Sequence, residues 1–304
     1  MTQSETPTRR QVLRSLAAAG SAVALSQTGF AAARAEAPNK ICAFTKPFES
    51  LSFDDMADTV VNLGFDGIEA TVRDGGHIEP VAVEDELPRM VEALQKRDLE
   101  ITIMASSVAS LDQPHSEKTL RTAAGLGIKM YRLGYYMYDL DKPVIDQIEQ
   151  IRPKLADLAA LNRELGIAAV YQTHSGSNIF GAPIWDLHSL VKDHSPREIG
   201  VALDVAHTTV EGGLCWPLHY NLMRAHLGAT YVKDFSWVNG KVRWGPLGVG
   251  HAASRMFAMI HASGFAGPIS LHVEYLDRRG PDAVKNHVAA FRRDLETLHQ
   301  WMSQ

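Results

Sequence analysis

The segments Ile167-Ala-Ala-Val-Tyr-Gln-Thr-His174 and Gly200-Val-Ala-Leu-Asp-Val-Ala-His207 indicate which fold this chain of 304 residues adopts. Each is a short apolar run, typical of a buried strand, that ends in polar side chains able to bind a metal ion. Two later runs, Thr230-Tyr-Val-Lys-Asp234 and Ile269-Ser-Leu-His-Val-Glu-Tyr275, end in the same way. The carboxyl ends of parallel strands meet at one face of a barrel. Four such ends therefore predict one shared functional site.

Apolar runs of this kind alternate with helical patterns from Lys40 onward, without a linker or a low-complexity break. Eight strand–helix units in one domain predict an α/β fold, the (β/α)8 TIM barrel. The alternative is an open doubly wound sheet, but Phe44-Thr-Lys-Pro-Phe48 after the first strand lacks the glycines of a dinucleotide-binding turn. The predicted strands are Ile41–Phe44, Gly67–Thr71, Glu100–Ala105, Met130–Leu133, Ala168–Gln172, Gly200–Asp204, Thr230–Lys233 and Ile269–Glu274.

The helical stretches share one ending device. In Asn62-Leu-Gly-Phe, Glu164-Leu-Gly-Ile and Ala262-Ser-Gly-Phe, a glycine just past the helix supplies a left-handed cap. The sixth helix, near Leu218–His226, is the least clear. The other predicted helices are Phe53–Leu63, Leu87–Arg97, Ser116–Leu126, Val144–Leu165, Ile184–Asp193, Ala252–Ser263 and Pro281–Met302.

The N-terminus resembles an export signal. Thr8-Arg9-Arg10-Gln11-Val12-Leu13 matches the twin-arginine pattern, and an Ala-rich stretch and the cleavage pattern Ala33-Arg34-Ala35 follow it. We therefore expect a signal peptide over residues 1–35, a barrel over residues 36–304 and a periplasmic protein. The alternatives are a disordered basic tail or a short membrane anchor. Polar residues interrupt the apolar stretch, which falls short of the roughly 20 apolar residues of a span, so we expect no membrane association after cleavage.

Charge and cysteine content exclude some classes of partner. The net charge is −5, and removal of residues 1–35, with four arginines and one glutamate, leaves −8. Nucleic-acid binding depends on clustered Lys and Arg, so we expect no nucleic-acid partner. Cys42 and Cys215 are the only cysteines. Two distant cysteines do not make a disulfide framework, and we predict two buried free thiols.

Two strand ends carry carboxylates with a histidine nearby. Asp204 ends the sixth strand, with His207 three residues later, and Glu274 lies near the end of the eighth. A carboxylate inside an apolar strand is costly unless it is paired or coordinated, which favours a metal or catalytic role for Glu274. His272 shares the face of Glu274, because strand side chains alternate with period two. Asp204 as a helix cap, with His207 as a loop residue and His272 as a buried histidine, is the structural alternative.

The neighbouring strand ends add neutral and basic groups. Gln172 and His174 share one face of the fifth strand, and Gln is a neutral oxygen ligand that hard divalent ions accept. Lys233 could polarise a carbonyl or hold an oxyanion. Its alternative is a solvated ion pair with Asp234.

Further candidates lie in the loops of the same face. Glu69 lies in the second strand, and Arg73 and His77 follow that strand in a basic, glycine-containing loop. This loop either clamps a polyol or an anionic group or forms an ordinary turn. Exposed indoles stack well on sugar rings, although core packing is the usual role of tryptophan. The loops after strands six and seven hold Trp216, Trp237 and Trp244.

Together these endings make the chain similar to the sugar phosphate isomerase/epimerase family, the xylose isomerase-like TIM barrels that also include endonuclease IV. That family has Glu-Asn-His, Asp-x-x-His, His-x-Lys-Asp and a terminal Glu at successive strand ends, with Gly-x-Gly before the last unit. Here the endings read Gln172-Thr-His174, Asp204-Val-Ala-His207, Tyr231-Val-Lys-Asp234 and Glu274, with Gly248-Val-Gly250. The resemblance covers essentially the whole mature chain.

The resemblance implies a divalent metal cation (manganese, magnesium or zinc) held at the ends of strands five to eight. It also implies that two glutamates move a proton between neighbouring carbons of a sugar through a metal-stabilised enediolate. Asp204 and Glu274 match the family's ligands. Gln172 and Tyr231 stand where the family has Glu and His, and a Gln cannot take a proton. His272, His174 or His207 would have to supply the missing ligand.

We therefore expect a sugar isomerase/epimerase-like enzyme that abstracts a proton next to the carbonyl of a small sugar or keto-sugar. Two alternatives stay open: a lyase or hydratase acting on 3-keto-glycosides, and a metal-free carbohydrate-binding barrel. A homodimer is one option for the oligomeric state. The expected site is catalytic Glu274, His174, His207 and Lys233, substrate-binding Glu69, Arg73, His77, Trp216 and Trp237, and metal-binding Gln172, Asp204, Glu274 and His272.

Overall fold

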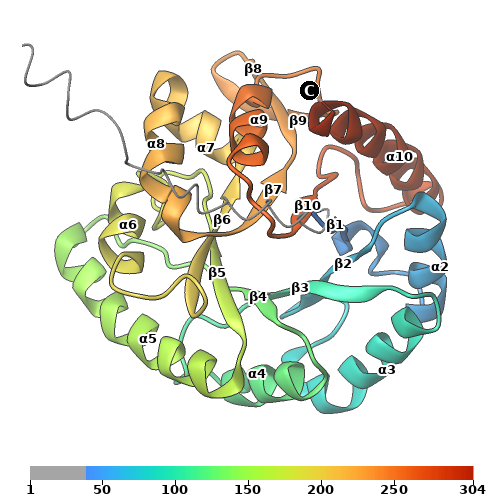
Figure 1. Cartoon of the computed structure of the whole chain (residues 1–304), viewed down its shortest axis with the longest axis horizontal. Helices are drawn as coiled ribbons and strands as arrows, with labels where there is room; N and C mark the ends of the chain where they lie inside the picture. Colours follow the sequence, from blue (N-terminus) through green and yellow to red (C-terminus); the bar gives the residue numbers. More distant parts are fainter. Residues whose placement is uncertain (1–38, 304) are drawn as a thin grey trace, which may run out of the picture. The chain divides into compact units, whose positions relative to one another are not determined.

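Eight parallel strands of residues 39–303, the part of the chain that this computed structural model describes, close into a barrel (Figure 1). The order around the barrel is β1-β10-β7-β6-β5-β4-β3-β2, so the last strand closes the ring against the first. The predicted single-domain TIM barrel is confirmed, whereas the predicted export signal at 1–35 lies outside the described residues. The strands are β1 (Ile41–Phe44), β2 (Gly67–Val72), β3 (Glu100–Ser106), β4 (Met130–Arg132), β5 (Ala168–Gln172), β6 (Ile199–Asp204), β7 (Leu227–Val232) and β10 (Ile269–Leu271).

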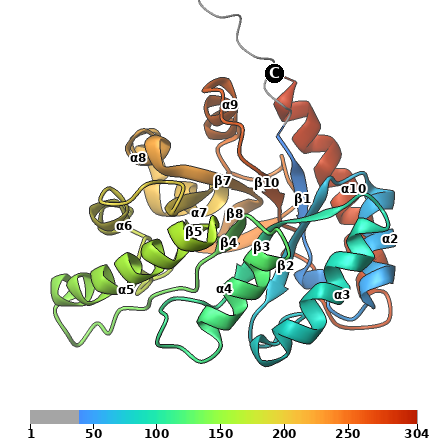
Figure 2. The ribbon, with the colours of Figure 1, turned by 60° about the horizontal axis from the view of Figure 1, so that its bottom comes forward.

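Helices surround the barrel, where α3 packs between α2 and α4 and α5 follows them around the ring (Figures 1 and 2). Gly64 and Gly166 end α2 and α5 with φ of 89° and 65°, a left-handed backbone that glycine adopts without strain, as predicted. The helices are α2 (Phe53–Leu63), α3 (Val83–Gln95), α4 (Ser116–Gly125), α5 (Val144–Leu165), α6 (Trp185–Val191), α7 (Val205–Gly212), α8 (Trp216–Met223), α9 (Ser254–Ala262) and α10 (Ala283–Met302).

Two elements near the barrel mouth differ from the prediction. The least clear sixth helix is instead the pair α7 and α8, and α7 begins directly after β6 because the Asp204 side chain caps it by accepting from the His207 N–H. His207 is therefore a helix residue. The segment after β7 forms an antiparallel hairpin, β8 (Asp234–Val238) and β9 (Lys241–Gly245), so Trp237 and Trp244 lie on strands.

The inward faces of the strands form a small inner core. Its members come from five strands and are Cys42, Ile103, Val170, Ala202, Ala229 and Tyr231. Alternate residues face outward and pack under the helices in the main core. Cys42 is a buried free thiol, as predicted. The same prediction is wrong for Cys215, which is exposed because the short turn between α7 and α8 buries none of its residues.

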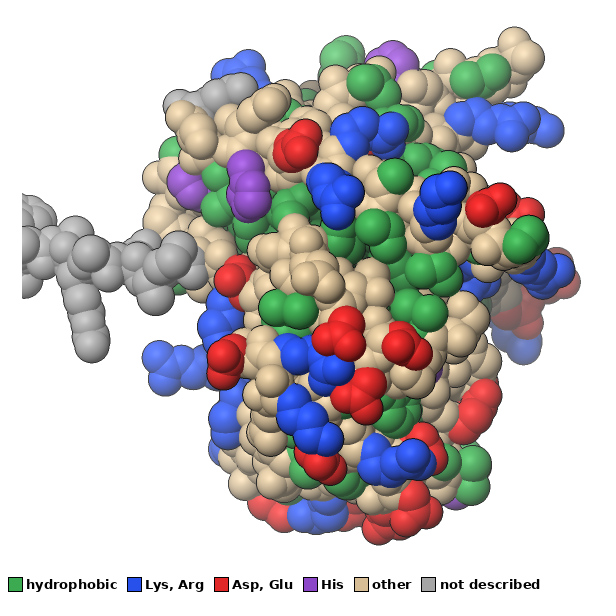
Figure 3. Space-filling model, turned by 90° about the vertical axis from the view of Figure 1, so that its right-hand side faces the viewer, with side chains coloured by type: hydrophobic (Ala, Val, Ile, Leu, Met, Phe, Trp, Pro, Cys, Tyr) green, Lys and Arg blue, Asp and Glu red, His purple; other side chains and the backbone are tan. Residues whose placement is uncertain are grey.

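The outer surface of α10, α2 and α3 carries interspersed acidic and basic side chains (Figure 3). Arg97 after α3, for example, pairs with Asp54 and Asp58 of α2. This face therefore shows no continuous basic patch of the kind that binds nucleic acid. Among the helices of residues 39–303, none has the length and apolar character that crossing a bilayer requires.

Candidate active site

Polar side chains at the carboxyl ends of neighbouring strands face the barrel interior at one level. Gln172 and Asp204 are the last residues of β5 and β6, Lys233 follows β7, and His272 and Glu274 follow β10. The first four are almost fully buried. The spacing of His272 and Glu274 places them on one face but does not say which face. The strand register directs both side chains inward. A cavity of about 100 Å³ opens at this level, lined among others by Arg132, Gln172, His174, Lys233, His272 and Glu274.

Lys233 lies between the two carboxylates. Its Nζ is 2.8 Å from Glu274 Oε2 and 3.3 Å from Asp204 Oδ2. Burial would lower the pKa of Lys233, but both carboxylates outweigh it and raise that pKa. Burial also opposes ionisation of Asp204 and Glu274, yet Lys233 lowers the pKa of Asp204 to about 2 and that of Glu274 well below its ordinary value. At neutral pH the cation and both anions are therefore charged.

The Gln172 side chain is held by donors on one side and an acceptor on the other. Arg132 Nη1 and Tyr135 Oη donate to Gln172 Oε1 at 2.9 and 2.5 Å. Gln172 Nε2 donates to Asp204 Oδ2 at 2.8 Å. Because a flipped amide would set donor against donor, this network allows one orientation of the amide. Gln172 therefore directs a nitrogen donor, and no free oxygen lone pair, toward Asp204.

Glu69 lies beneath the cavity and orients His272. His272 Nε2 donates to Glu69 Oε2 at 2.8 Å, and Tyr231 and Ser270 donate to the same carboxylate at 2.9 and 2.6 Å. Burial disfavours both charged forms, but their mutual attraction prevails, lowering the pKa of Glu69 and raising that of His272. His272 Nδ1 faces Glu274 Oε2 at 3.7 Å and has no hydrogen-bond partner among the described residues.

His174 lines the cavity from the end of β5 and is kept neutral. Its Nδ1–H donates to the Ser175 carbonyl at 2.9 Å, which leaves the Nε2 lone pair free. Its ring packs at a tilt against that of His207, with the ring centroids 3.8 Å apart, and Trp244 packs edge-on against His207. Burial and Lys233 lower the pKa of His174, and burial lowers that of His207 well below its ordinary value. The pair thus presents one neutral imidazole nitrogen to the cavity.

The donor set does not suit a divalent ion. Such an ion needs several oxygen or nitrogen lone pairs directed at one point. Gln172 directs an N–H at Asp204, Lys233 directs an ammonium at both carboxylates, and Tyr231 donates its hydroxyl to Glu69. Within residues 39–303, no three His, Cys, Asp or Glu side chains are grouped to hold a metal ion. The expected metal-binding residues come together, but Lys233 occupies the space between their carboxylates.

Several expected site residues lie elsewhere. Glu69 is fully buried below the cavity. His77 is held by its ring nitrogen against the Leu51 carbonyl at 2.9 Å. Trp216 packs against the main core, and Trp237 is half exposed on the hairpin. None of these four lines the cavity, whereas Arg73 does.

Asp234 does not form the solvated ion pair with Lys233 that was the alternative interpretation of this strand end. Neighbouring residues of an extended segment point to opposite sides, and Asp234 faces outward. Its carboxylate accepts from the backbone N–H groups of Gly248, Gly250 and Ala252 at 2.8–2.9 Å. This carboxylate therefore anchors the glycine loop next to the site.

Four cavity-lining residues were not predicted: Phe44, Lys46, Arg132 and Tyr135. Arg132 had a usable signal, because a charged residue within the apolar run Met130–Arg132 must find a polar environment inside the barrel. Lys46 and Tyr135 lie in connecting segments after β1 and β4, where periodicity carries no information about direction.

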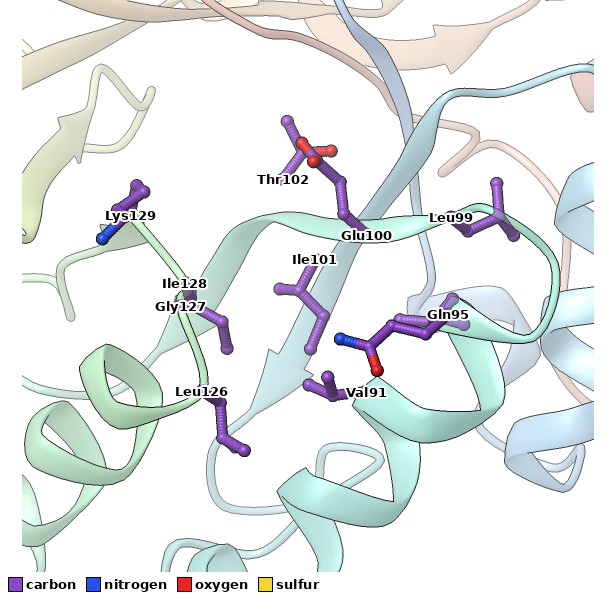
Figure 4. A pocket seen from close by; sticks show the side chains of 11 residues that line it. Val91, Gln95, Leu99, Glu100, Ile101, Thr102, Leu126, Gly127, Ile128 and Lys129 are labelled. Carbon is purple, nitrogen blue, oxygen red and sulfur yellow. The ribbon is translucent and has the colours of Figure 1, made fainter.

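A second cavity, of about 130 Å³, lies at the opposite end of the strands, near the start of β3. Figure 4 shows Ile101 directed toward Val91 of α3, with Leu126 beside them. Its side chains are mainly aliphatic, and it offers no convergent acid–base groups. Conserved chemistry in barrels of this type is built at the carboxyl ends of the strands, so the first cavity is the candidate active site.

Comparison with known proteins agrees with this architecture. Among solved structures, the 3-keto-D-glucoside 4-epimerase from E. coli, in its apo form, is 15% identical over 86% of this chain and 99% of its own, with a TM-score of 0.66. D-psicose 3-epimerase in the presence of D-fructose is 15% identical over 87% and 100%, with a TM-score of 0.65. A xylose isomerase-like TIM barrel protein from Mycobacterium smegmatis in complex with magnesium is 16% identical over 86% and 96%, with a TM-score of 0.62.

At these low sequence identities, the similarity shows the fold alone. None of the curated proteins matches this chain. The family model for the xylose isomerase-like TIM barrel, however, matches residues 57–299, most of the chain. The chain therefore belongs to the xylose isomerase-like TIM barrel family.

Proposed function

We propose that this protein is a sugar isomerase/epimerase-like enzyme that moves a proton next to the carbonyl of a sugar. One observation carries the proposal: the Lys233 ammonium lies between Glu274 and Asp204 in the cavity at the carboxyl ends of the strands. A base and a fixed positive charge side by side are what enolate formation requires. The likeness to epimerases of ketoses and keto-glucosides supports a sugar or keto-sugar substrate.

Glu274 is the base in this proposal and Lys233 the oxyanion partner. The C–H bond next to the carbonyl breaks, its proton passes to Glu274, and the electron pair moves onto the carbonyl oxygen, which Lys233 stabilises. In the free protein Lys233 holds the pKa of Glu274 low. A substrate oxygen that attracts Lys233 weakens that ion pair and makes Glu274 a better base.

His174 supplies the second proton-transfer group. Gln172 cannot take a proton, but the free Nε2 of the neutral His174 can accept or, once protonated, return one. His207 supports the His174 ring from behind. Return of the proton to the same carbon from the other face is an epimerisation, and return to the neighbouring carbon is an isomerisation.

The lyase alternative uses the same enolate. If a leaving group stands next to the enolate carbon, the electron pair expels it and no second base is needed. The presence of one carboxylate base at the cavity, with Gln172 in place of the second, favours this outcome for 3-keto-glycosides. Product analysis by NMR separates the two, because elimination releases the aglycone and epimerisation keeps it.

The metal that the sequence resemblance implied has no suitable donor set here, so no step is assigned to it. We propose that Lys233 supplies the positive charge. A periplasmic location remains our proposal too, based on the twin-arginine pattern at Thr8–Leu13. Fractionation of cells that express the chain with Arg9→Lys and Arg10→Lys should show loss of the protein from the periplasm; unchanged export would contradict it.

The test of the activity is exchange of a substrate C–H proton with D₂O, followed by NMR across ketoses and keto-glycosides. Loss of a general base slows proton transfer by about 10²- to 10⁴-fold, which is the effect expected of Glu274→Gln. Arg89→Gln, an exposed change on α3, is the control. A panel without any exchange, release or Glu274-dependent turnover would leave the carbohydrate-binding barrel as the better account.

A further inference from the structure

Two arginines face the candidate active site without a carboxylate partner. Arg73 and Arg132 both line the cavity. Among residues 39–303, no carboxylate oxygen lies within 4.0 Å of either guanidinium, whereas the partly exposed Arg152 and the exposed Arg121 each pair with two carboxylates. Unpaired guanidinium groups are common in water but costly inside a protein. Their place here therefore calls for an explanation.

Arg132 is the more buried of the two. It is 4% exposed, and its Nε has no hydrogen-bond partner among the described residues. Nη1 donates to Gln172 and Tyr135, both uncharged groups. Burial opposes the charge, but Tyr135 and the carboxylates Glu69 and Glu274, more than 4.0 Å away, raise the pKa of Arg132. Arg132 therefore brings a full positive charge and an unused donor to the cavity.

The surrounding charges leave an excess of positive charge at this side of the cavity. Lys233 and Lys46 together match Asp204 and Glu274, and His272 matches Glu69. Burial and the neighbouring Arg132 both lower the pKa of Arg73. Lys46 lies at the entrance, 3.6 Å from Glu274 Oε1, so the two lysines use both carboxylates and leave neither for the arginines. The guanidinium groups of β4 and of the segment after β2 therefore repel each other.

The aromatic neighbours of the pair fix the direction of both groups. The Arg73 guanidinium lies 5.7 Å from the Phe44 ring centroid, and that of Arg132 lies 5.3 Å from the Tyr135 ring. Phe44 in turn stacks on His272 at 4.3 Å. A guanidinium that rests on an aromatic face keeps its N–H edges free for a second partner.

We propose that Arg73 and Arg132 bind a carboxylate of the substrate, so that the enzyme acts on a sugar acid rather than on a neutral sugar. The proposal rests on the proposed function for the identity of the site, and it adds the class of substrate. The planar fork of a guanidinium matches a carboxylate in two parallel hydrogen bonds. With the carboxylate held there, the carbonyl end of the sugar reaches Lys233 and Glu274 in the same cavity of about 100 Å³.

Calorimetric titration of the full protein at low ionic strength tests this with sugar acids, neutral sugars of matched size and one sugar phosphate. The probes are D-glucuronate, D-galacturonate and D-gluconate, their neutral counterparts D-glucose, D-galactose and D-sorbitol, and D-glucose 6-phosphate. At least one sugar acid should bind at least about 10-fold more tightly than its neutral counterpart. Arg73→Gln should weaken that binding by about 10- to 100-fold, as expected for loss of charge-assisted hydrogen bonds.

Controls separate charge from folding. Arg73→Lys keeps the charge but not the fork, so it should lose less affinity than Arg73→Gln. Arg89→Gln removes an exposed arginine and should leave binding unchanged. Arg132→Gln is informative only if its melting temperature stays near that of the parent, and Arg73, being partly exposed, is the primary site for that reason.

Three outcomes overturn the proposal: sugar acids that bind no more tightly than neutral sugars, binding that Arg73→Gln does not weaken, or selective binding of the sugar phosphate. Proton exchange is recorded on the same panel. Exchange with neutral sugars that Arg73→Gln leaves intact would refute the anion site and preserve the proposed function. Sugar-acid binding that depends on Arg73, without exchange in any sugar, would preserve the anion site and refute the proton transfer.

Discussion

Lys233→Met tests the electrostatics of the site most sharply. Methionine is of similar length but uncharged, so Asp204, which is fully buried, and Glu274, with a quarter of its side chain exposed, lose their shared cation. Removing one partner of a buried ion pair costs about 3–5 kcal/mol. The pKa of Asp204, lowered from 3.8 to about 2, corresponds to a contribution of about 2 kcal/mol, which is of the same order.

The stability of Lys233→Met should depend on pH in the opposite direction to the contribution of Asp204 in the parent protein. Because folding lowers the pKa of Asp204, its stabilising contribution is complete above the unfolded value of 3.8 and is lost as the pH falls toward 2. Lys233 is the largest of the charges that oppose the effect of burial on Asp204, so Lys233→Met should raise the pKa of Asp204. The free energy of unfolding of this variant should therefore rise as the pH falls from about 7 to about 5.

Urea unfolding followed by the fluorescence of the five tryptophans measures the stability lost in Lys233→Met and the change of that stability with pH. Lys285→Met, an exposed lysine of α10, is the control for loss of a charge. Adding Asp204→Asn to Lys233→Met should recover part of the lost stability, because the fully buried carboxylate that Lys233 balanced is then gone. If Lys233→Met is as stable as the parent at pH 7, or loses stability on mild acidification, the ammonium does not balance the carboxylates as argued.

Three further perturbations follow from the same contacts. Glu69→Gln removes the partner that raises the pKa of His272. The stability that this pairing contributes is present below the ordinary histidine pKa of 6.5 and is lost as the pH rises through the folded pKa, so the variant should lose more stability at about pH 5.5 than at about pH 9. An equal loss at both pH values would contradict the pairing. Gly250→Ala places a Cβ 2.2 Å from the Phe235 carbonyl oxygen and should destabilise the protein by about 1–3 kcal/mol, whereas Gly245→Ala, with nothing within 4 Å of its Cβ, should be nearly neutral in the same urea assay. Treatment with EDTA should leave the melting temperature unchanged in scanning calorimetry; a clear fall would show that a bound metal ion stabilises the site after all.

Much of the fold could be predicted because barrel strands are buried on both faces. Their Val, Ile and Ala runs stand out from the helical patterns, and all eight strands lie at the predicted places with small differences at their ends. The capping glycines at the ends of α2 and α5 were equally clear. The hairpin β8–β9 was missed because its strand Asp234–Val238 follows β7 almost without a break.

The candidate site could be predicted only in part. The period of two places Lys233 on the same face as Tyr231, but it does not say how far Lys233 reaches across to β6 and β10. That reach depends on the stagger of three strands, which pairs Asp204 with Tyr231 and Leu271 with Val232. The sequence therefore indicated the residues of the site and not the ammonium between the carboxylates. Glu69 is an instructive case, since an acid in a strand suggested substrate binding and the structure shows it orienting His272.

Proton exchange in D₂O by EDTA-treated protein tests the central claim most directly, that a protein cation rather than a metal ion accompanies the base at the strand ends. We predict that NMR will show deuterium entering the carbon next to the substrate carbonyl at the same rate with and without added magnesium or manganese. Lys233→Met and Glu274→Gln should each abolish most of that exchange. Exchange that requires added metal, or that persists in both variants, would contradict the account.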